Sequence, residues 1–479
     1  MSLYPRVDWE RTVSASVDMS GAPAIAVAAN NWVYFAASGK GSITGTDGKS
    51  LSGGQNSYRI LLGAYDPAGV LQWLFQDPKL VSGTADYTPS LSLGDDGEIY
   101  IAYVTNGATP GNKNATNIFS PCGTCGTYKG PEDIVVARID GVTTGVPAVT
   151  WVLQDYSLNS CARELGPKIL YDSVGKRLLL TYQTSGATVC QARIGSPNVV
   201  VVSLSTSGAL GWVYQGNQMN SAGQNEHPSI AVDVSGNVYL AYSTTASLPG
   251  GGPLQGVRDI QVIQLSMSQG GCETGISRGW ILSASSNINT PATEQQPDII
   301  YDPVTNLLIL AYTTNGIVSG GSFSGATTSL VIAAIQLNGV LKWIIQSPVF
   351  NEEFYKYKYA LEPVITADVL GNIYVVIRAH NDTGSDTIVM FSVNSNTGDS
   401  RWPSRWTFVC NNDYFRGYLF GIPTRSPPAI GIYNGDIYVS YISGLDGSLL
   451  MYALAQRFQF SDITAFDYMN LSICDSGCS

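Results

Sequence analysis

Short apolar runs separated by turn residues recur along the whole chain. Four of them share one shape, with a turn of Asp, Gly or Asn between two apolar halves: PSLSLGDDGEIYIAY (89–103), PSIAVDVSGNVYLAY (228–242), PVITADVLGNIYVVI (363–377) and PAIGIYNGDIYVSY (428–441). These turn residues tolerate the positive φ angles of tight hairpins. Each run therefore predicts two antiparallel strands, which we name strand a and strand b.

Two further strands complete each unit. An apolar run that we name strand c follows the hairpin at 133–140, 198–205, 259–266, 329–336 and 386–393. A tryptophan then leads strand d, as W-x-x-Q at 73–76, 151–154, 212–215 and 343–346, with looser copies from Trp280 and Trp406. The unit is a four-stranded meander, and its Val, Ile, Leu and Ala content is typical of sheets buried on both faces.

A proline opens strand a seven times, at intervals of 61–78 residues: Pro23, Pro89, Pro167, Pro228, Pro297, Pro363 and Pro428. Proline suits the first residue of a strand because no hydrogen bond of the sheet is lost there. Seven four-stranded meanders predict an all-β, seven-bladed β-propeller with four-stranded antiparallel blades. A β-helix would repeat at a shorter period, and a sandwich would not repeat.

The copies of strand d indicate how the ring closes. Blades one to six each have a tryptophan strand, whereas blade seven, which contains strand c at 448–455, has none after it. The missing copy stands at the other end of the chain, where residues 7–15 contain Trp9. We expect this N-terminal strand to complete blade seven and remove two exposed sheet edges. On this prediction the propeller spans 1–455, and residues 456–479 form a C-terminal tail. The alternative is that 456–468 forms the outer strand of blade seven.

The repeat resembles the bacterial-type seven-bladed β-propeller repeat family. The likeness is carried by 228–242 and 259–266, while 204–212 and 392–402 are similar to the turn-Gly-Trp ending of quinoprotein-type repeats. The resemblance implies the fold and no particular activity, because the family has no common catalytic motif. Similar repeats occur in secreted and surface proteins and in proteins of large DNA viruses, which implies a surface or virion component.

Composition narrows the partners and the compartment. The net charge is −11 with only 25 Lys and Arg, which argues against nucleic acid and against an anionic membrane surface. No run reaches the 18 apolar residues of a membrane-spanning helix, and the N-terminus has no apolar leader. Eight cysteines in a Lys-poor chain favour an oxidising setting. We therefore expect no membrane insertion, and an extracellular, surface or virion location rather than a cytoplasmic one.

An acidic residue recurs shortly before the prolines of strand a. Asp86, Glu164 and Glu294 each lie three residues before their proline, whereas Glu226 and Glu362 lie two and one before theirs. The d–a loops of a propeller gather at one end of its channel, so these carboxylates are predicted at the channel mouth. There they would suit Ca²⁺, a basic peptide or glycosidase chemistry. The favoured alternative is that each accepts hydrogen bonds within its own loop, because a repeated position serves the repeat.

Few other residues suggest chemistry. His227 and His380 are the only histidines, and His227 is the ligand-binding candidate because it adjoins Glu226 at the predicted channel mouth, although a lone histidine is more often structural. No sequence motif of a hydrolase, zinc protease or phosphate-binding loop is present. Apart from Ca²⁺, no cofactor or metal is predicted.

The cysteines provide disulfide candidates. These candidates fall in three groups: Cys122 with Cys125, Cys474 with Cys478, and Cys161 with Cys190. The first two groups together could form a four-thiolate zinc site, but local disulfides or free thiols are favoured. Cys161 and Cys190 are expected on the same face of the ring, where they would form a bridge.

The leading hypothesis for function is a non-enzymatic binding or structural module that recognises a protein or glycan. Its basis is the complete repeat without a catalytic motif, together with long b–c loops on one face at 36–57, 104–132, 243–258 and 313–328. The alternative is a hydrolase or lyase with carboxylates at the channel mouth.

Overall fold

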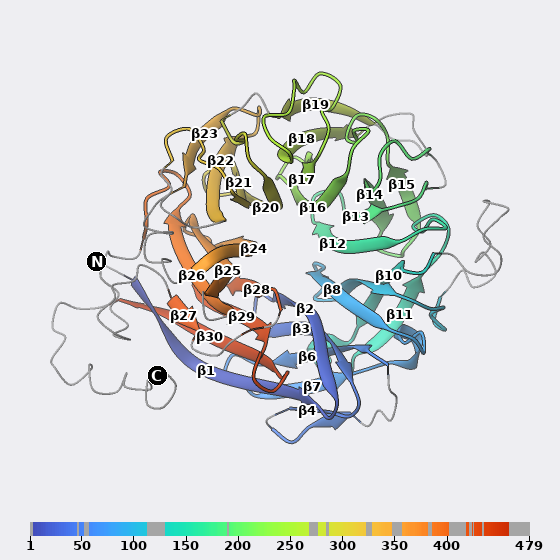
Figure 1. Ribbon diagram of the computed structural model, residues 1–479. Coiled ribbons are helices and arrows are strands. Elements are labelled where there is room, and N and C mark those ends of the chain that lie inside the picture. The colour runs from blue at the N-terminus through green and yellow to red at the C-terminus, as the bar shows by residue number, and fades with distance from the viewer. Residues whose placement is uncertain are drawn as a thin grey trace.

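Seven antiparallel sheets form a ring in the computed structural model (Figure 1). The structure describes residues 3–45, 47–51, 57–112, 130–188, 191–267, 276–283, 287–321, 328–346, 357–381, 386–401, 418–420, 424, 426–433 and 435–458. The predicted all-β, seven-bladed architecture is confirmed. Within these residues the helices are two 3₁₀ turns, η1 (Pro78–Leu80) and η3 (Val142–Thr144). None of the described helices is long and apolar enough to span a membrane.

Each blade places strand a nearest the axis of the ring and strand d at the rim. Blade one has β2 (Asp18–Val27), β3 (Val33–Lys40), β6 (Arg59–Tyr65) and β7 (Leu71–Phe75). Blade two has β8 (Asp86–Leu93), β9 (Ile99–Thr105), β10 (Asp133–Asp140) and β11 (Ala148–Leu153). Blade three has β12 (Glu164–Asp172), β13 (Arg177–Thr184), β14 (Asn198–Ser205) and β15 (Leu210–Tyr214). Blade four has β16 (Asn225–Val232), β17 (Val238–Thr244), β18 (Asp259–Met267) and β19 (Ile276–Leu282).

The remaining blades follow the same order. Blade five has β20 (Glu294–Asp302), β21 (Leu307–Thr314), β22 (Ser329–Gln336) and β23 (Leu341–Ile345). Blade six has β24 (Tyr357–Ala367), β25 (Asn372–Asn381), β26 (Asp386–Asn394) and β27 (Tyr418–Phe420). Blade seven has β28 (Ala429–Tyr433), β29 (Asp436–Ile442), β30 (Leu449–Phe458) and β1 (Leu3–Ala15). The outer strand expected at Trp406 in blade six is instead β27 in the described part of the chain, and Trp406 itself lies outside it.

The hydrophobic core is divided among the junctions between blades. Buried side chains form seven clusters, and each cluster joins two neighbouring sheets. Strand b contributes fully buried segments, such as β9 and β21. A single blade cannot bury both of its faces, so stability depends on completing the ring.

The tryptophans of strand d tie each blade to the next. The indole N–H donates to a carbonyl in the following blade's c–d turn at five junctions: Trp9 to Pro67, Trp73 to Val142, Trp151 to Thr206, Trp280 to Leu337 and Trp343 to Ser395. At three of these junctions a glycine of the turn lies against the indole, and a Cβ on Gly339 would come within 2.8 Å of Trp280. The tryptophan of the W-x-x-Q motif therefore serves the packing of one blade against the next.

The N-terminal strand closes the ring as predicted. β1 pairs antiparallel with β30 from Leu3↔Phe458 to Val13↔Leu449, so it starts earlier than the expected 7–15. Because β30 is the third strand of blade seven, the alternative closure by 456–468 is not the one adopted in the described residues. Residues 459–479 lie outside them.

Part of the first b–c loop strengthens this closure. Within 36–57, the short strands β4 (Ile43–Gly45) and β5 (Ser50–Leu51) form a hairpin. β4 pairs with β1, which extends blade seven to six strands. The hairpin therefore covers the outer edge of β1 at its last three residues, Val13–Ala15.

We expect Trp9→Ala to lower the free energy of unfolding by about 3–5 kcal/mol, as for other buried tryptophans. Trp9 is 7% exposed, contacts Tyr65 and Tyr438, and donates its indole N–H to Pro67 at 3.3 Å. Chemical denaturation followed by circular dichroism measures the change. The matched variant Trp9→Phe retains an aromatic ring and should lose about 1 kcal/mol, the value of one hydrogen bond. Equal losses in the two variants would contradict this account of the closure.

Candidate functional site

The acids three residues before the strand-a prolines are buried within their own loops. Asp86 accepts hydrogen bonds from Ser82 at 2.8 Å and Thr105 at 2.6 Å. Glu164 and Glu294 bind the equivalent hydroxyls, and all three carboxylates are fully buried. Each of these three carboxylates therefore accepts hydrogen bonds within its own loop, as the favoured alternative expected, and we call them clamps of the d–a loops.

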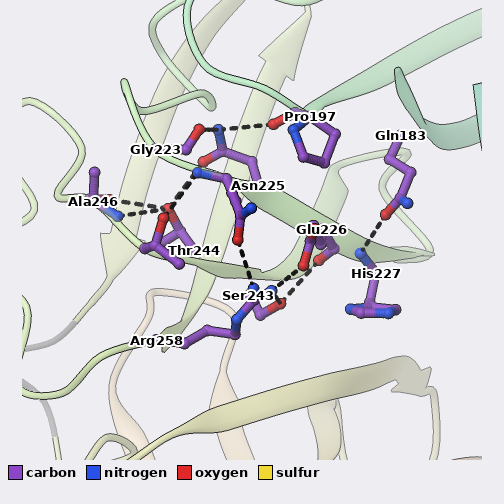
Figure 2. A network of polar contacts seen from close by, with 12 residues as sticks. Gln183, Pro197, Gly223, Asn225, Glu226, His227, Ser243, Thr244, Ala246 and Arg258 are labelled. Carbon is purple, nitrogen blue, oxygen red and sulfur yellow. Dashed lines mark hydrogen bonds and ion pairs between the residues drawn. The ribbon is translucent and has the colours of Figure 1, made fainter. Parts of the chain in front are cut away.

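Asn225 occupies this repeated position in blade four (Figure 2). Its Oδ1 accepts from Ser221 at 2.9 Å and Thr244 at 3.0 Å, while its Nδ2 donates to the carbonyl of Gly223 at 3.2 Å. The fold therefore accepts a neutral side chain at this position. Burial correspondingly raises the pKa of Glu164 to about 8, that of Glu294 to about 7 and that of Asp86 to about 6.

A different set of residues surrounds the axis at the loop-bearing end of the ring. The residue directly before the strand-a proline has positive φ in five blades: Thr88 (49°), Gly166 (63°), His227 (54°), Gln296 (55°) and Glu362 (53°). We name these five residues the axial row. Each lies where the register between strands a and b shifts, so it is the extra residue of a β-bulge.

The axial row holds backbone strain. A left-handed conformation is costly for residues with a side chain, above all for a β-branched one such as Thr88. A following proline further restricts the residue before it toward extended conformations. Strain of this kind concentrates at functional sites. The row is therefore a candidate site among the described residues.

Two amide side chains support the row from the preceding blade. Gln183 Oε1 accepts the backbone N–H of His227 at 3.1 Å, and Gln296 Oε1 accepts that of Glu362 at 3.1 Å. His227 is solvent-exposed, and in Figure 2 its imidazole projects away from Gln183. Surrounding protein nevertheless desolvates the ring and lowers its pKa below the usual value. The lowered pKa favours the neutral form of the imidazole.

Beside His227, Glu226 forms an ion pair with Arg258 (Figure 2). Arg258 also donates to Gln224 Oε1 at 2.9 Å, and the two ion-pair side chains are 16% and 19% exposed. Glu226 is thus brought next to His227, as predicted from sequence, but its charge is compensated by a cation that the sequence analysis did not select.

In blade six, one arginine serves two carboxylates. Arg378 Nε lies 2.9 Å from Glu362, and its Nη1 lies 3.1 Å from Asp386. Burial raises the pKa of Glu362, which Arg378 opposes and Asp386 reinforces. Glu362 remains 27% exposed, so it holds its proton to a higher pH than an ordinary glutamate while staying accessible. This combination suits a proton donor.

The candidate site therefore combines Glu226, His227 and Glu362 with Arg258 and Arg378. Asp86, Glu164 and Glu294 are buried and accept hydrogen bonds within their own loops, and a ligand-binding role for them stays a prediction. Gln183, Arg258, Arg378 and Asp386 were missed, because their relevance depends on register between strands. In the described part of the chain, no group of three His, Cys, Asp or Glu side chains is arranged to hold a metal.

The cysteine predictions fall largely outside the described residues. Cys161 is disulfide-bonded. The other disulfide candidates, Cys122, Cys125, Cys190, Cys474 and Cys478, lie outside the described ranges. The pairing of Cys161 with Cys190 stays a prediction.

Comparisons with known proteins find the fold and no family. The chain matches no protein-family model, and no curated protein is significantly similar to it. An ulvan lyase of a polysaccharide lyase family gives a TM-score of 0.47 and 11% identity over 98% of this chain and 99% of that one. The GH93 alpha-L-arabinofuranosidase of Fusarium graminearum gives 0.44 and 9% over 77% and 92%. A Dyadobacter fermentans protein of unknown function gives 0.43 and 9% over 77% and 94%.

The expectation of a non-enzymatic binding or structural module is wrong on this comparison. The two similar structures named above that have a stated activity are enzymes acting on carbohydrates. At these identities the likeness shows the fold alone. The hydrolase or lyase alternative is taken up below from the residues of the axial row.

Proposed function

We propose that this chain is a carbohydrate-active hydrolase or lyase whose active site is the axial row with its supporting arginines. The observation that carries the proposal is the pairing of two opposite pKa shifts on accessible, strained residues. Glu362 has a raised pKa, His227 has a lowered one, and both have positive φ. A raised pKa helps a glutamate to hold a proton that it can donate, and a lowered pKa leaves a histidine neutral and able to accept one, which are the roles of an acid and a base.

The proposed chemistry begins with the step that both reaction types share. Glu362 gives its proton to the departing glycosidic oxygen, which leaves as a sugar hydroxyl. In a hydrolase, neutral His227 accepts a proton from the water that attacks the anomeric carbon. In a lyase, it accepts the proton from the carbon next to a uronate carboxyl group, and a carbon–carbon double bond forms. In either case Glu362 loses one proton and His227 gains one.

The supporting residues position these two groups. Gln296 accepts a hydrogen bond from the backbone N–H of Glu362. Arg378 contacts the carboxyl group of Glu362 through Nε and that of Asp386 through Nη1, which fixes the position of both. Gln183 holds the backbone of His227, and the Glu226–Arg258 pair stands beside it. His227 and Glu362 lie on separate blades with Gln296 between them in the row, which gives an extended substrate room to contact both.

The test is a panel of neutral and uronate-containing polysaccharides incubated with the full chain. New reducing ends are measured together with the ultraviolet absorbance of an unsaturated uronate. We expect at least one polysaccharide to be cleaved. Reducing ends without the absorbance identify a hydrolase, and both signals together identify a lyase. If no glycan of the panel is cleaved between mildly acidic and neutral pH, the proposal is overturned.

A further inference from the structure

The residue directly after the strand-a proline lies along the inner edge of its blade. In blades two, four and five its side chain accepts a backbone N–H from strand a of the next blade. Ser90 accepts that of Ile169 at 3.1 Å, and Ser229 and Asp298 form the equivalent bonds at 3.2 and 3.0 Å. Blades one, six and seven have buried or half-buried apolar residues there: Ala24, Val364 and Ala429. This position therefore either joins two neighbouring blades or is apolar.

Lys168 of blade three departs from this rule. A lysine has no hydrogen-bond acceptor, so Lys168 cannot bind the N–H of Ile230, which is the equivalent residue of blade four. Lys168 is also exposed, whereas the residues at this position in the other blades are buried or half-buried. Neither the joining of blades nor the filling of the core explains the lysine.

The ammonium group of Lys168 has no partner in the described part of the chain, although the other lysines whose side chains are described each have one. Lys176 forms an ion pair with Asp95, and Lys40 lies over the ring of Tyr58. Three more donate hydrogen bonds: Lys49, Lys79 and Lys342. In a chain of net charge −11, an uncompensated cation on the wall of the channel attracts anions, because the surrounding protein concentrates its field there.

The repeat also indicates where this cation lies. Ser90 reaches from blade two to Ile169, three residues after the axial-row member of blade three. By the same step, Lys168 extends toward Ile230, three residues after His227. The strands that carry them, β12 and β16, lie side by side at the axis of the ring (Figure 1). Lys168 and His227 therefore share one part of the channel wall.

We propose that Lys168 is a specificity-determining residue that binds an anionic group of the substrate, a carboxylate or a sulfate ester, beside His227. This inference rests on the proposed function and deepens it by naming an acidic polysaccharide as the substrate class. The ammonium group has three N–H donors, and its hydrogen bonds to an anion are charge-assisted. Because no described ion pair of Lys168 has to be broken first, the whole of this interaction is available to the substrate.

Lys168→Ser tests the proposal, because serine is the residue of blades two and four at this position. We expect kcat/KM on an acidic polysaccharide cleaved by the wild type to fall about tenfold or more, the value of a hydrogen bond to a charged group. The loss should appear mainly in KM, since Glu362 and His227 stay in place, and Lys168→Arg should retain most of the activity. Stability should not fall, because serine can accept the N–H of Ile230.

Two chemically treated forms of the same polysaccharide distinguish the anionic groups. Either reduction of its carboxyl groups or removal of its sulfates should abolish the difference between the wild type and Lys168→Ser, and the effective treatment identifies the group. The difference should also shrink at high salt, which screens the charge. A difference that survives both treatments would overturn the proposal.

Lys176→Ser is the matched control. Lys176 is an exposed lysine of the same blade, but it lies in the a–b turn, away from the axial row, and is paired with Asp95. This variant should cleave as the wild type does. If Lys168→Ser cleaves an acidic polysaccharide with unchanged KM, or if the wild type cleaves only neutral ones, the role of Lys168 is overturned and the proposed function stands. If the wild type cleaves nothing, both are overturned. If Lys168→Ser fails to fold, Lys168→Gln decides by the same comparison of KM.

Discussion

Glu362→Gln is expected to lower kcat/KM on the cleaved polysaccharide by about 100- to 10,000-fold, the usual contribution of a positioned proton donor. The amide has nearly the shape of the acid but has no proton to give to the departing oxygen. The matched control is Glu294→Gln, since Glu294 is a buried loop clamp that touches Thr290 and Thr314. That variant should keep its activity. Equal activities of both variants and the wild type would remove Glu362 from the mechanism.

The pH profile of the wild type provides an independent check of the two roles. Activity requires neutral His227, so it falls when pH drops below the lowered pKa of the imidazole. It also requires protonated Glu362, so it falls when pH rises above the raised pKa of that carboxyl group. We therefore expect a bell-shaped profile of kcat/KM. In Glu362→Gln, the alkaline decline should disappear from the residual activity.

Glu164→Gln is expected to stabilise the protein by about 4 kcal/mol at pH 8 and to have little effect at pH 4, from the size of the pKa shift. The folded state raises the pKa of Glu164 from 4.5 to about 8 because the side chain is fully buried. Below pH 4.5 both states hold the proton. Between pH 4.5 and about 8 the unfolded chain ionises first, so wild-type stability falls as pH rises. Glutamine has no proton to lose and removes this part of the decline.

The reverse substitution is made in blade four, where Asn225 already has an amide at the repeated acid position. Asn225→Asp adds a buried carboxyl group among Ser221 and Thr244, so it should cost more stability at pH 8 than at pH 4. Denaturant titrations of both variants and the wild type at the two pH values measure the effects. If Glu164→Gln is no more stable than the wild type at pH 8, Glu164 is not held neutral by burial.

The fold was largely predictable because each repeat unit separates its strands with recognisable turn residues. The predicted strands c at 133–140, 198–205 and 329–336 coincide with β10, β14 and β22, since their apolar runs end at clear turn signals. Closure by the Trp9 strand followed from counting tryptophans. The hairpin of β4 and β5 was missed, because its pairing with β1 joins blades one and seven and leaves no periodic signal in 36–57.

The site was predictable only in part. Asp86, Glu164 and Glu294 share one offset from their prolines, and this regularity identifies them as parts of the repeat. Glu226 and Glu362 depart from that offset; Glu226 adjoins the axial row, and Glu362 belongs to it. The departure from the repeat was therefore the useful signal. A left-handed backbone conformation before a proline cannot be inferred from residue type, so the sequence did not identify Thr88 and Gln296 as members of the axial row.

The most direct test of the account is an NMR titration of His227 in protein labelled at histidine. The chain has only two histidines, and His227→Asn assigns the signals. We expect His227 to titrate below the usual value for histidine and its signal to shift when a saccharide from the cleaved polysaccharide is added to inactive Glu362→Gln. A normal pKa, together with a His227 signal that stays unmoved by a saccharide the protein cleaves, would contradict the placement of the active site at the axial row.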